Sequence, residues 1–248
     1  LKDRGLVGGI PDIFSERTNL EHLDLSENGI AHTLPPSFAC LTNLVTLDLS
    51  DNEMTGTISA ISKLPCLTEL IITNNRFEGN IPESLGNLHR LERLILAKNS
   101  FKDRIPSFIG NLTQLETLNF ANNLFFGTLS SQLKRLTALT VINLSYNDLT
   151  GTIPNLQGLD RLRYLILNNN KLVGNIPPSL GDLPNLERLD LSNNKFSGTI
   201  PNKIGNLAKL NHLNLSNNEI SGGILAFENL QSLKELNLSK NYFNEPDD

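Results

Sequence analysis

The sequence lacks long apolar runs and any excess of positive charge. No stretch approaches the ~20 apolar residues that a helix needs to cross a bilayer, so we expect no direct membrane insertion by this chain. Its first residues, LKDRGLVGG, have neither the basic nor the apolar region of a secretory signal peptide. Its 21 Lys and Arg are outnumbered by 26 Asp and Glu, and the net charge of −5 disfavours nucleic acid as a partner.

The usual sequence signatures of enzymes are also missing. The chain contains no GxGxxG segment, no phosphate-binding loop, no HExxH and no CxxC. His22 and Asp24 could form an acid–base pair, but no motif places a serine or cysteine nucleophile beside them. We therefore predict that the chain is not an enzyme and holds no cofactor, and that His22 and His212 are surface residues.

A repeat of about two dozen residues runs through the chain. A leucine opens the same phrase ten times, at Leu20, Leu44, Leu67, Leu91, Leu115, Leu139, Leu162, Leu186, Leu210 and Leu233. One copy cannot bury its own apolar face, so a fixed period of this length predicts stacking of each copy on the next. We predict one domain over residues 1–248, with 1–19 as a partial leading repeat. Because the chain starts within a repeat and without Met, we expect it to be a piece of a longer protein.

Each repeat predicts a strand, a bend and a short outer turn. Leu189, Asp190 and Leu191 alternate apolar and polar side chains, as in a strand with one buried face, and successive copies must pair in parallel. An asparagine follows every strand, and its amide can satisfy backbone groups at the bend. The PxxLGxL phrase that closes several repeats suits a 3₁₀ turn. The predicted fold is therefore an α/β solenoid with a parallel concave sheet and short 3₁₀ or helical turns on the convex side.

The phrase LxxLxxLxLSxNxLxGxIPxxLGxL, clearest at residues 186–207, resembles the plant-type leucine-rich repeat. This resemblance implies a right-handed horseshoe, at the cell surface or outside the cell, that recognises peptides, hormones, co-receptors or pathogen enzymes. Plant members carry paired-cysteine caps that this chain lacks. Its two cysteines, Cys40 and Cys66, are three residues out of register in neighbouring repeats, which favours two unpaired thiols over a disulfide.

Outward-facing strand positions are the candidate binding site. Most should be polar, but several are aliphatic or aromatic and lie near arginines, a composition typical of interface hot spots. On this basis the predicted partner-binding residues are Glu69, Ile71, Arg93, Ile95, Val141, Tyr146, Tyr164, Ile166 and Arg188. The alternative is that isolated apolar residues on a surface have no role.

Acidic residues gather at the N-terminal end of the same face. The acidic patch comprises Asp24, Glu27, Asp48 and Asp51. Converging carboxylates could hold calcium, but a solvated charged face that steers a basic ligand is the favoured interpretation, and we predict no metal.

Four sequons offer possible glycosylation sites, at Asn111, Asn143, Asn214 and Asn237. The repeat itself places a serine two residues after the strand asparagine, so three of these arise from the repeat. Only Asn111 is independent of it.

Together these features predict a module that binds a protein or peptide, most simply a ligand-binding ectodomain fragment of a plant-type receptor. Two alternatives remain. One is a secreted inhibitor of a fungal cell-wall hydrolase, and the other is a cytoplasmic adaptor or effector on the same scaffold.

Overall fold

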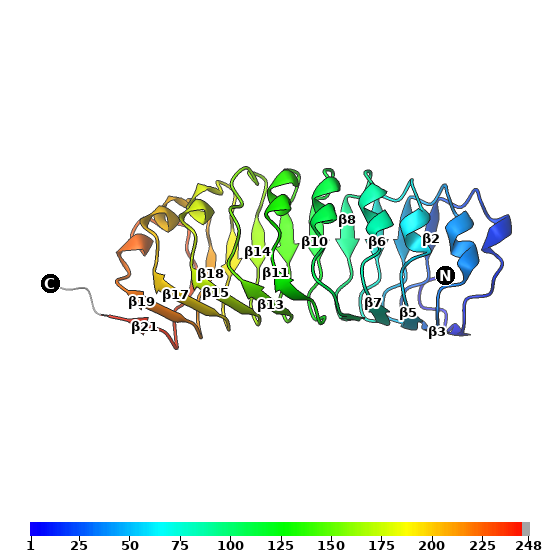
Figure 1. Ribbon diagram of the computed structural model, residues 1–248, viewed down its shortest axis with the longest axis horizontal. Coiled ribbons are helices and arrows are strands. Elements are labelled where there is room, and N and C mark those ends of the chain that lie inside the picture. Colours follow the sequence, from blue (N-terminus) through cyan, green and yellow to red (C-terminus); the bar gives the residue numbers. More distant parts are fainter. Residues whose placement is uncertain (245–248) are drawn as a thin grey trace.

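A computed structural model describes residues 1–244 as a stack of parallel coils, one for each repeat (Figure 1). Each coil contributes a strand to one long sheet, bends and contributes a second short strand. Most coils then return through an outer 3₁₀ turn. The predicted solenoid with a parallel sheet and 3₁₀ turns is confirmed. No helix within residues 1–244 is long and apolar enough to span a membrane.

The long sheet contains ten parallel strands in the order of the repeats. Its strands are β2 (His22–Asp24), β4 (Thr46–Asp48), β6 (Glu69–Ile71), β8 (Arg93–Ile95), β10 (Thr117–Asn119), β12 (Val141–Asn143), β14 (Tyr164–Ile166), β16 (Arg188–Asp190), β18 (His212–Asn214) and β20 (Glu235–Asn237). Equivalent positions of the repeat pair directly, so Leu47 lies between Leu23 and Leu70. We call the outward face of this sheet the concave face.

A second set of strands was not predicted from the sequence. Five of them, β1 (Val7–Gly8), β3 (Gly29–His32), β5 (Glu53–Gly56), β7 (Arg76–Gly79) and β9 (Ser100–Phe101), form one parallel sheet along the side of the solenoid. Six more, β11 (Phe126–Thr128), β13 (Asp148–Gly151), β15 (Lys171–Asn175), β17 (Lys195–Thr199), β19 (Glu219–Gly222) and β21 (Tyr242–Phe243), form another. We call their outward surface the lateral face. The expectation of one strand per repeat was therefore wrong, because the outward residues of these segments, such as Glu53, Phe126 and Lys171, share no polarity that recurs from coil to coil.

The outer layer consists of short 3₁₀ turns. They are η1 (Phe14–Glu16), η2 (Pro36–Cys40), η3 (Ile61–Lys63), η4 (Glu83–Asn87), η5 (Ser107–Asn111), η6 (Ser131–Arg135), η7 (Pro178–Asp182), η8 (Asn202–Asn206) and η9 (Leu225–Phe227). Glycine in the PxxLG phrase lets adjacent turns approach closely. A Cβ added at Gly181 would lie 2.1 Å from the Lys203 carbonyl oxygen, and one at Gly205 would lie 2.8 Å from that of Ala226.

The core is a continuous set of leucine columns between the concave sheet and the outer turns. Leu47, Leu70, Leu94 and Leu118 are completely buried, as the alternation of apolar and polar positions predicts. Phe101 and Phe125, at equivalent positions of neighbouring coils, stack with ring centroids 6.1 Å apart. The last coil has nothing on its far side within residues 1–244, and Leu236 there is 45% exposed, whereas Leu213 in the preceding coil is 1% exposed.

The ten asparagines join each coil to the one before it. The Nδ2 of Asn123 donates to the carbonyl oxygens of Leu96, Phe120 and Ala121 at 3.0, 3.2 and 3.3 Å. Its Oδ1 accepts the N–H of Phe101 at 3.1 Å. The predicted structural role of these asparagines is confirmed, because one buried amide satisfies backbone groups of two successive coils.

Replacing Asn123 with Ala should destabilise the protein strongly. The change leaves the buried Phe101 N–H without an acceptor and removes a donor from three carbonyls, at a cost on the order of 3 kcal/mol. Urea unfolding followed by circular dichroism measures this difference. Asn202→Ala is the matched control, because Asn202 is exposed and should change stability by less than about 0.5 kcal/mol. Equal effects of the two substitutions would contradict the assigned role.

Gly181→Ala should also destabilise, because its Cβ would overlap the Lys203 carbonyl and force adjacent outer turns apart. The expected cost is about 1–3 kcal/mol. Gly223→Ala serves as the control, since nothing lies within 4 Å of the added Cβ. The same urea titration compares them, and an unchanged midpoint for Gly181→Ala would rule out close packing as the reason for this glycine.

Candidate functional site

Two outward positions of each strand form columns that run along the concave face. The first column begins at His22 and ends at Glu235, and the second begins at Asp24 and ends at Asn237. Neighbours in a column come from paired strands and therefore stand about 4.8 Å apart. All predicted binding residues except Tyr146 lie in these columns.

Most side chains of the second column form hydrogen bonds within the protein, to the bend that follows their strand. Oδ1 of Asp48 accepts both the N–H and the hydroxyl of Ser50, at 2.9 and 2.6 Å. Asn143 does the same with Ser145, at 3.1 and 2.7 Å. An Asp or Asn at this position thus anchors the bend that follows its strand.

Three isoleucines interrupt this pattern. At these positions the side chain, of Ile71, Ile95 or Ile166, has no oxygen that could accept the backbone N–H two residues later. The three side chains are only partly buried. The fold therefore gains no hydrogen bond from them, and they leave apolar surface in contact with water.

The apolar residues of the concave face form two groups. Ile71 and Ile95 are paired neighbours on β6 and β8 and make the first group. Val141, Tyr164 and Ile166 lie on β12 and β14 and make the second. The five residues do not form one continuous patch, because Thr117 and Asn119 on β10 lie between the two groups.

A charged network fixes the tyrosine of the second group. Glu187 accepts from Nε of Arg163 at 2.7 Å and from its NH2 group at 3.0 Å, and the hydroxyl of Tyr164 donates to the same carboxylate at 3.3 Å. The Arg163 guanidinium lies 5.4 Å from the centre of the Tyr164 ring. These hydrogen bonds lower the pKa of Glu187 and raise that of Arg163. The ring of Tyr164 is therefore held in place before any ligand arrives.

The remaining predicted residues carry charge. Arg93 pairs with Glu69 on the neighbouring strand. Arg188 has Asp190 at 3.7 Å, and His212 pairs with Glu235 at 2.6 Å. His22 is exposed, as predicted. His212 lies in the same outward column, with its side chain 19% exposed.

Tyr146 lies outside the columns, at the bend between β12 and β13. It adopts a left-handed backbone with φ of 54°, at a position where five other coils have asparagine. A bulky residue rarely adopts this conformation, and its ring is 52% exposed. The ring thus projects where the concave and lateral faces meet.

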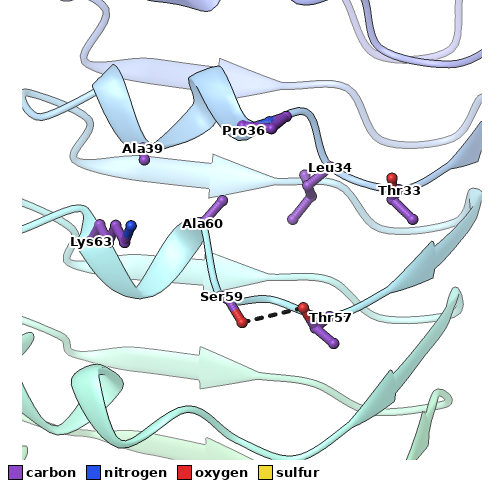
Figure 2. A pocket seen from close by; sticks show the side chains of 8 residues that line it. All are labelled: Thr33, Leu34, Pro36, Ala39, Thr57, Ser59, Ala60 and Lys63. Carbon is purple, nitrogen blue, oxygen red and sulfur yellow. Dashed lines mark hydrogen bonds between the residues drawn. The ribbon is translucent and has the colours of Figure 1, made fainter.

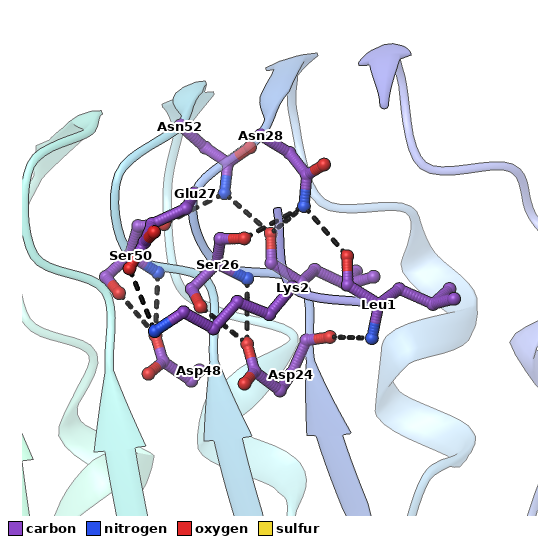
Figure 3. A network of polar contacts seen from close by, with 10 residues as sticks. Leu1, Lys2, Asp24, Ser26, Glu27, Asn28, Asp48, Ser50 and Asn52 are labelled. Atoms are coloured by element: carbon purple, nitrogen blue, oxygen red, sulfur yellow. Dashed lines mark hydrogen bonds and ion pairs between the residues drawn. The ribbon is translucent and has the colours of Figure 1, made fainter. Parts of the chain in front are cut away.

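The acidic patch borders a small hollow on the concave face, about 210 Å³ in volume. Figure 3 shows Asp24 and Asp48 side by side, each bonded to the serine that follows its strand. Partial burial opposes ionisation of Asp24, but hydrogen bonds from Ser26 lower its pKa overall. Lys2 pairs with Glu27 at 2.8 Å, and Asp51 accepts from Asn74.

Within residues 1–244, no three His, Cys, Asp or Glu side chains are grouped as metal ligands. A larger depression of about 510 Å³ lies between the first two full coils, beside η2 and η3 (Figure 2). Its lining is mainly apolar and hydroxyl groups, with Lys63 as the charged residue. Such a lining brings no set of reactive groups together.

The cysteines and sequons lie apart from both apolar groups, with one exception. Cys40 is exposed, Cys66 is partly buried, and both are free thiols. Asn111 is exposed at the end of η5 on the outer side. Asn143, Asn214 and Asn237 lie in the second column, and Asn143 is next to the second apolar group.

Exposed apolar residues on and beside the lateral face were not predicted. Phe126 and Val173 are each 39% exposed, and Leu124, just before β11, is 46% exposed. A signal was available, because Leu124 and Phe126 flank the buried Phe125 with the alternation of a strand.

Comparisons with known families agree with this architecture. A profile described as a leucine-rich repeat region matches residues 128–246. A profile for two copies of the leucine-rich repeat matches residues 18–55 and 42–88, and a single-repeat profile matches 90–112. A search of curated proteins by sequence gives no match.

Solved structures with similar folds include plant receptors. One is the plant peptide hormone receptor RGFR1 in complex with RGF2, which is 34% identical with a TM-score of 0.89. The match covers 98% of this chain and 43% of that chain. The Arabidopsis receptor kinase HAESA ectodomain, in complex with an extended IDA peptide hormone, is 35% identical with a TM-score of 0.89, over 96% of this chain and 40% of the receptor. The chain thus spans less than half of either receptor.

A plant ice-binding protein has a similar fold as well. It is 26% identical with a TM-score of 0.76, and the match covers 89% of this chain and 72% of that protein.

Replacing Arg163 with Gln should raise the pKa of Glu187 toward its ordinary value, because the guanidinium donates the hydrogen bonds that favour the carboxylate. In the wild type this pair stabilises the fold above the pH at which an unfolded glutamate titrates. The contribution disappears as the pH falls through the lowered pKa of the folded state. Carboxyl ¹³C NMR titration measures the shift, with Arg161→Gln as the control. An identical Glu187 titration in wild type and Arg163→Gln would refute the assignment.

Proposed function

The chain belongs to the plant-type leucine-rich-repeat proteins, and on this premise we propose that it is a ligand-recognition segment of a receptor ectodomain. Its ligand is a peptide or protein that binds to the concave face between β6 and β16. The function is binding rather than catalysis, and its setting is the cell surface.

One observation carries this proposal. At three of ten positions in the second column, an isoleucine replaces the Asp or Asn that elsewhere bonds to the following bend. The substitution exposes apolar area and contributes no internal hydrogen bond, so the fold does not explain it. A ligand that covers Ile71, Ile95 and Ile166 does explain it, because burial of apolar surface favours binding.

The neighbouring residues support the same function. Tyr164 is an aromatic side chain held by Arg163 and Glu187, so little conformational entropy is lost when a ligand packs on it. RGFR1 and HAESA, which share this fold, are both solved with peptide hormones bound. A secreted hydrolase inhibitor would instead bind a folded enzyme and would not select short peptides.

Ice binding is a second candidate function, favoured by one feature of the lateral face. Thr128, Thr152, Asn175 and Thr199 are exposed and uncharged at equivalent positions of successive coils, about 4.8 Å apart, a regular array that a crystal surface can match. Asp148, Lys171 and Lys195 on the same strands interrupt this array with charge, which favours the receptor function. An assay of ice recrystallisation inhibition tests this candidate directly.

The receptor function predicts that peptide binders depend on the concave face. A phage library of random dodecapeptides selected on the immobilised wild-type chain should yield clones that bind it. These clones should bind Ile95→Asp at least about tenfold more weakly, because a charge replaces an apolar anchor. Phage titration by immunoassay measures the loss.

Val173→Asp is the matched control, since it places the same charge at a partly exposed aliphatic residue of the lateral face. It should leave binding unchanged. If selection yields no binders, or if Val173→Asp abolishes binding while Ile95→Asp does not, the proposed site is wrong.

A further inference from the structure

We propose that the concave face recognises an extended peptide through two apolar side chains four residues apart, with a basic side chain beyond the first of them. This inference rests on the proposed function and adds the chemistry of the ligand. Its basis is the order of residues along the second column, where paired strands fix the register.

The column changes character in blocks. Asp24 and Asp48 are followed by Ile71 and Ile95, then by Asn119 and Asn143, and then by Ile166, all in direct register. A ligand lying along the column therefore passes an acidic block, an apolar block, an amide block and a second apolar block. Each block adjoins a different part of the ligand.

The ligand must lie across the strands rather than beside one. Strands β6 to β16 are each paired on both sides, so none offers a free backbone edge for strand addition. Binding at the centre of the concave face therefore depends on side chains. Those side chains change from one strand to the next, along the axis of the solenoid, so the ligand must lie along this axis.

The spacing of the two apolar blocks sets the spacing of the anchors. Ile95 and Ile166 are separated by three strand intervals, about 14 Å, and an extended peptide rises about 3.4 Å per residue. This distance corresponds to about four residues. Because side chains of an extended peptide alternate between two faces, positions i and i+4 point the same way, whereas i+3 and i+5 do not.

The amide block favours an extended ligand over a helical one. Within residues 1–244, Nδ2 of Asn119 and of Asn143 has no acceptor, although Oδ1 of each accepts an N–H two residues later. These amides can donate to main-chain carbonyls of a ligand. An extended peptide presents free carbonyls along its length, whereas the carbonyls inside a helix are already bonded.

The acidic block sets the charge at one flank. Among residues 1–244, the carboxylates of Asp24 and Asp48 accept bonds only from the hydroxyl and N–H groups of Ser26 and Ser50. Lys2 is near enough to interact with both charges but pairs directly with Glu27. Both carboxylates border the hollow next to Ile71. A Lys or Arg side chain two to four residues beyond the first anchor would reach them.

The test uses the dodecapeptide phage library and then synthetic peptides. Clones that require Ile95 should share two apolar residues at i and i+4, with Lys or Arg outside the first. A synthetic peptide of the consensus should lose at least about tenfold in affinity when one glycine is inserted between the anchors, as measured by fluorescence anisotropy. Deleting one residue there should have a similar effect.

Asp48→Asn supplies the control for the charged flank. Asn143 shows that an asparagine at this position keeps both bonds to the following serine, so the variant should fold normally. It should reduce the affinity of the consensus peptide several-fold and have no effect on a peptide whose basic residue is replaced by Gln.

The outcomes separate the two proposals. Clones that depend on Ile95 but show no preferred spacing, or tolerate the inserted glycine, overturn this inference and leave the proposed function standing. Clones that bind independently of Ile95 and Tyr164 overturn both. An i and i+4 consensus with a basic flank lost in Asp48→Asn supports both.

Discussion

The buried asparagine amide is the interaction on which this solenoid depends. At each bend the backbone leaves the concave sheet, and its N–H and C=O groups lose their strand partners. One side chain with a donor and an acceptor then bonds to two coils at once, as Asn123 does with Leu96 and Phe101 of the preceding coil and with Phe120 of its own. Because the bond crosses between coils, it fixes their register, and that register creates continuous columns on the outer faces. The proposed recognition surface is thus a consequence of how the backbone groups at the bends are hydrogen-bonded.

The sequence predicts the parts of this structure that repeat. Period, strand alternation and the invariant asparagine all follow from burying leucines and pairing backbone groups, and these features appear as expected. The lateral strands were not predicted, since their outward residues, such as Glu53, Phe126 and Lys171, share no common polarity. The pairing of His212 with Glu235 joins side chains of adjacent coils, which no single repeat encodes.

The candidate site was predictable as a list of residues but not as a shape. Polarity alone identified Ile71, Ile95 and Ile166 as unusual, and the register then divided the apolar residues into two groups. Neither the hydrogen bonds of Asp48 with Ser50 nor the unused amide donors of Asn119 could be read from composition. These hydrogen bonds and free donors depend on which lone pairs and N–H groups of the side chain already bond to the bend that follows the strand. The difference between a structural and a recognition residue is therefore geometric, even within one column of similar side chains.

The pairing of the central strands has a consequence for how the contacts of a ligand can be spaced. Each strand from β6 to β16 bonds to a strand on both of its sides, so moving one strand against its neighbours would break main-chain hydrogen bonds on two edges at once. Coils in a linear array also gain stability from each neighbour. Ile95 and Ile166, the proposed anchors, therefore stand on a doubly supported part of the array, where a fixed distance between two contacts can be maintained.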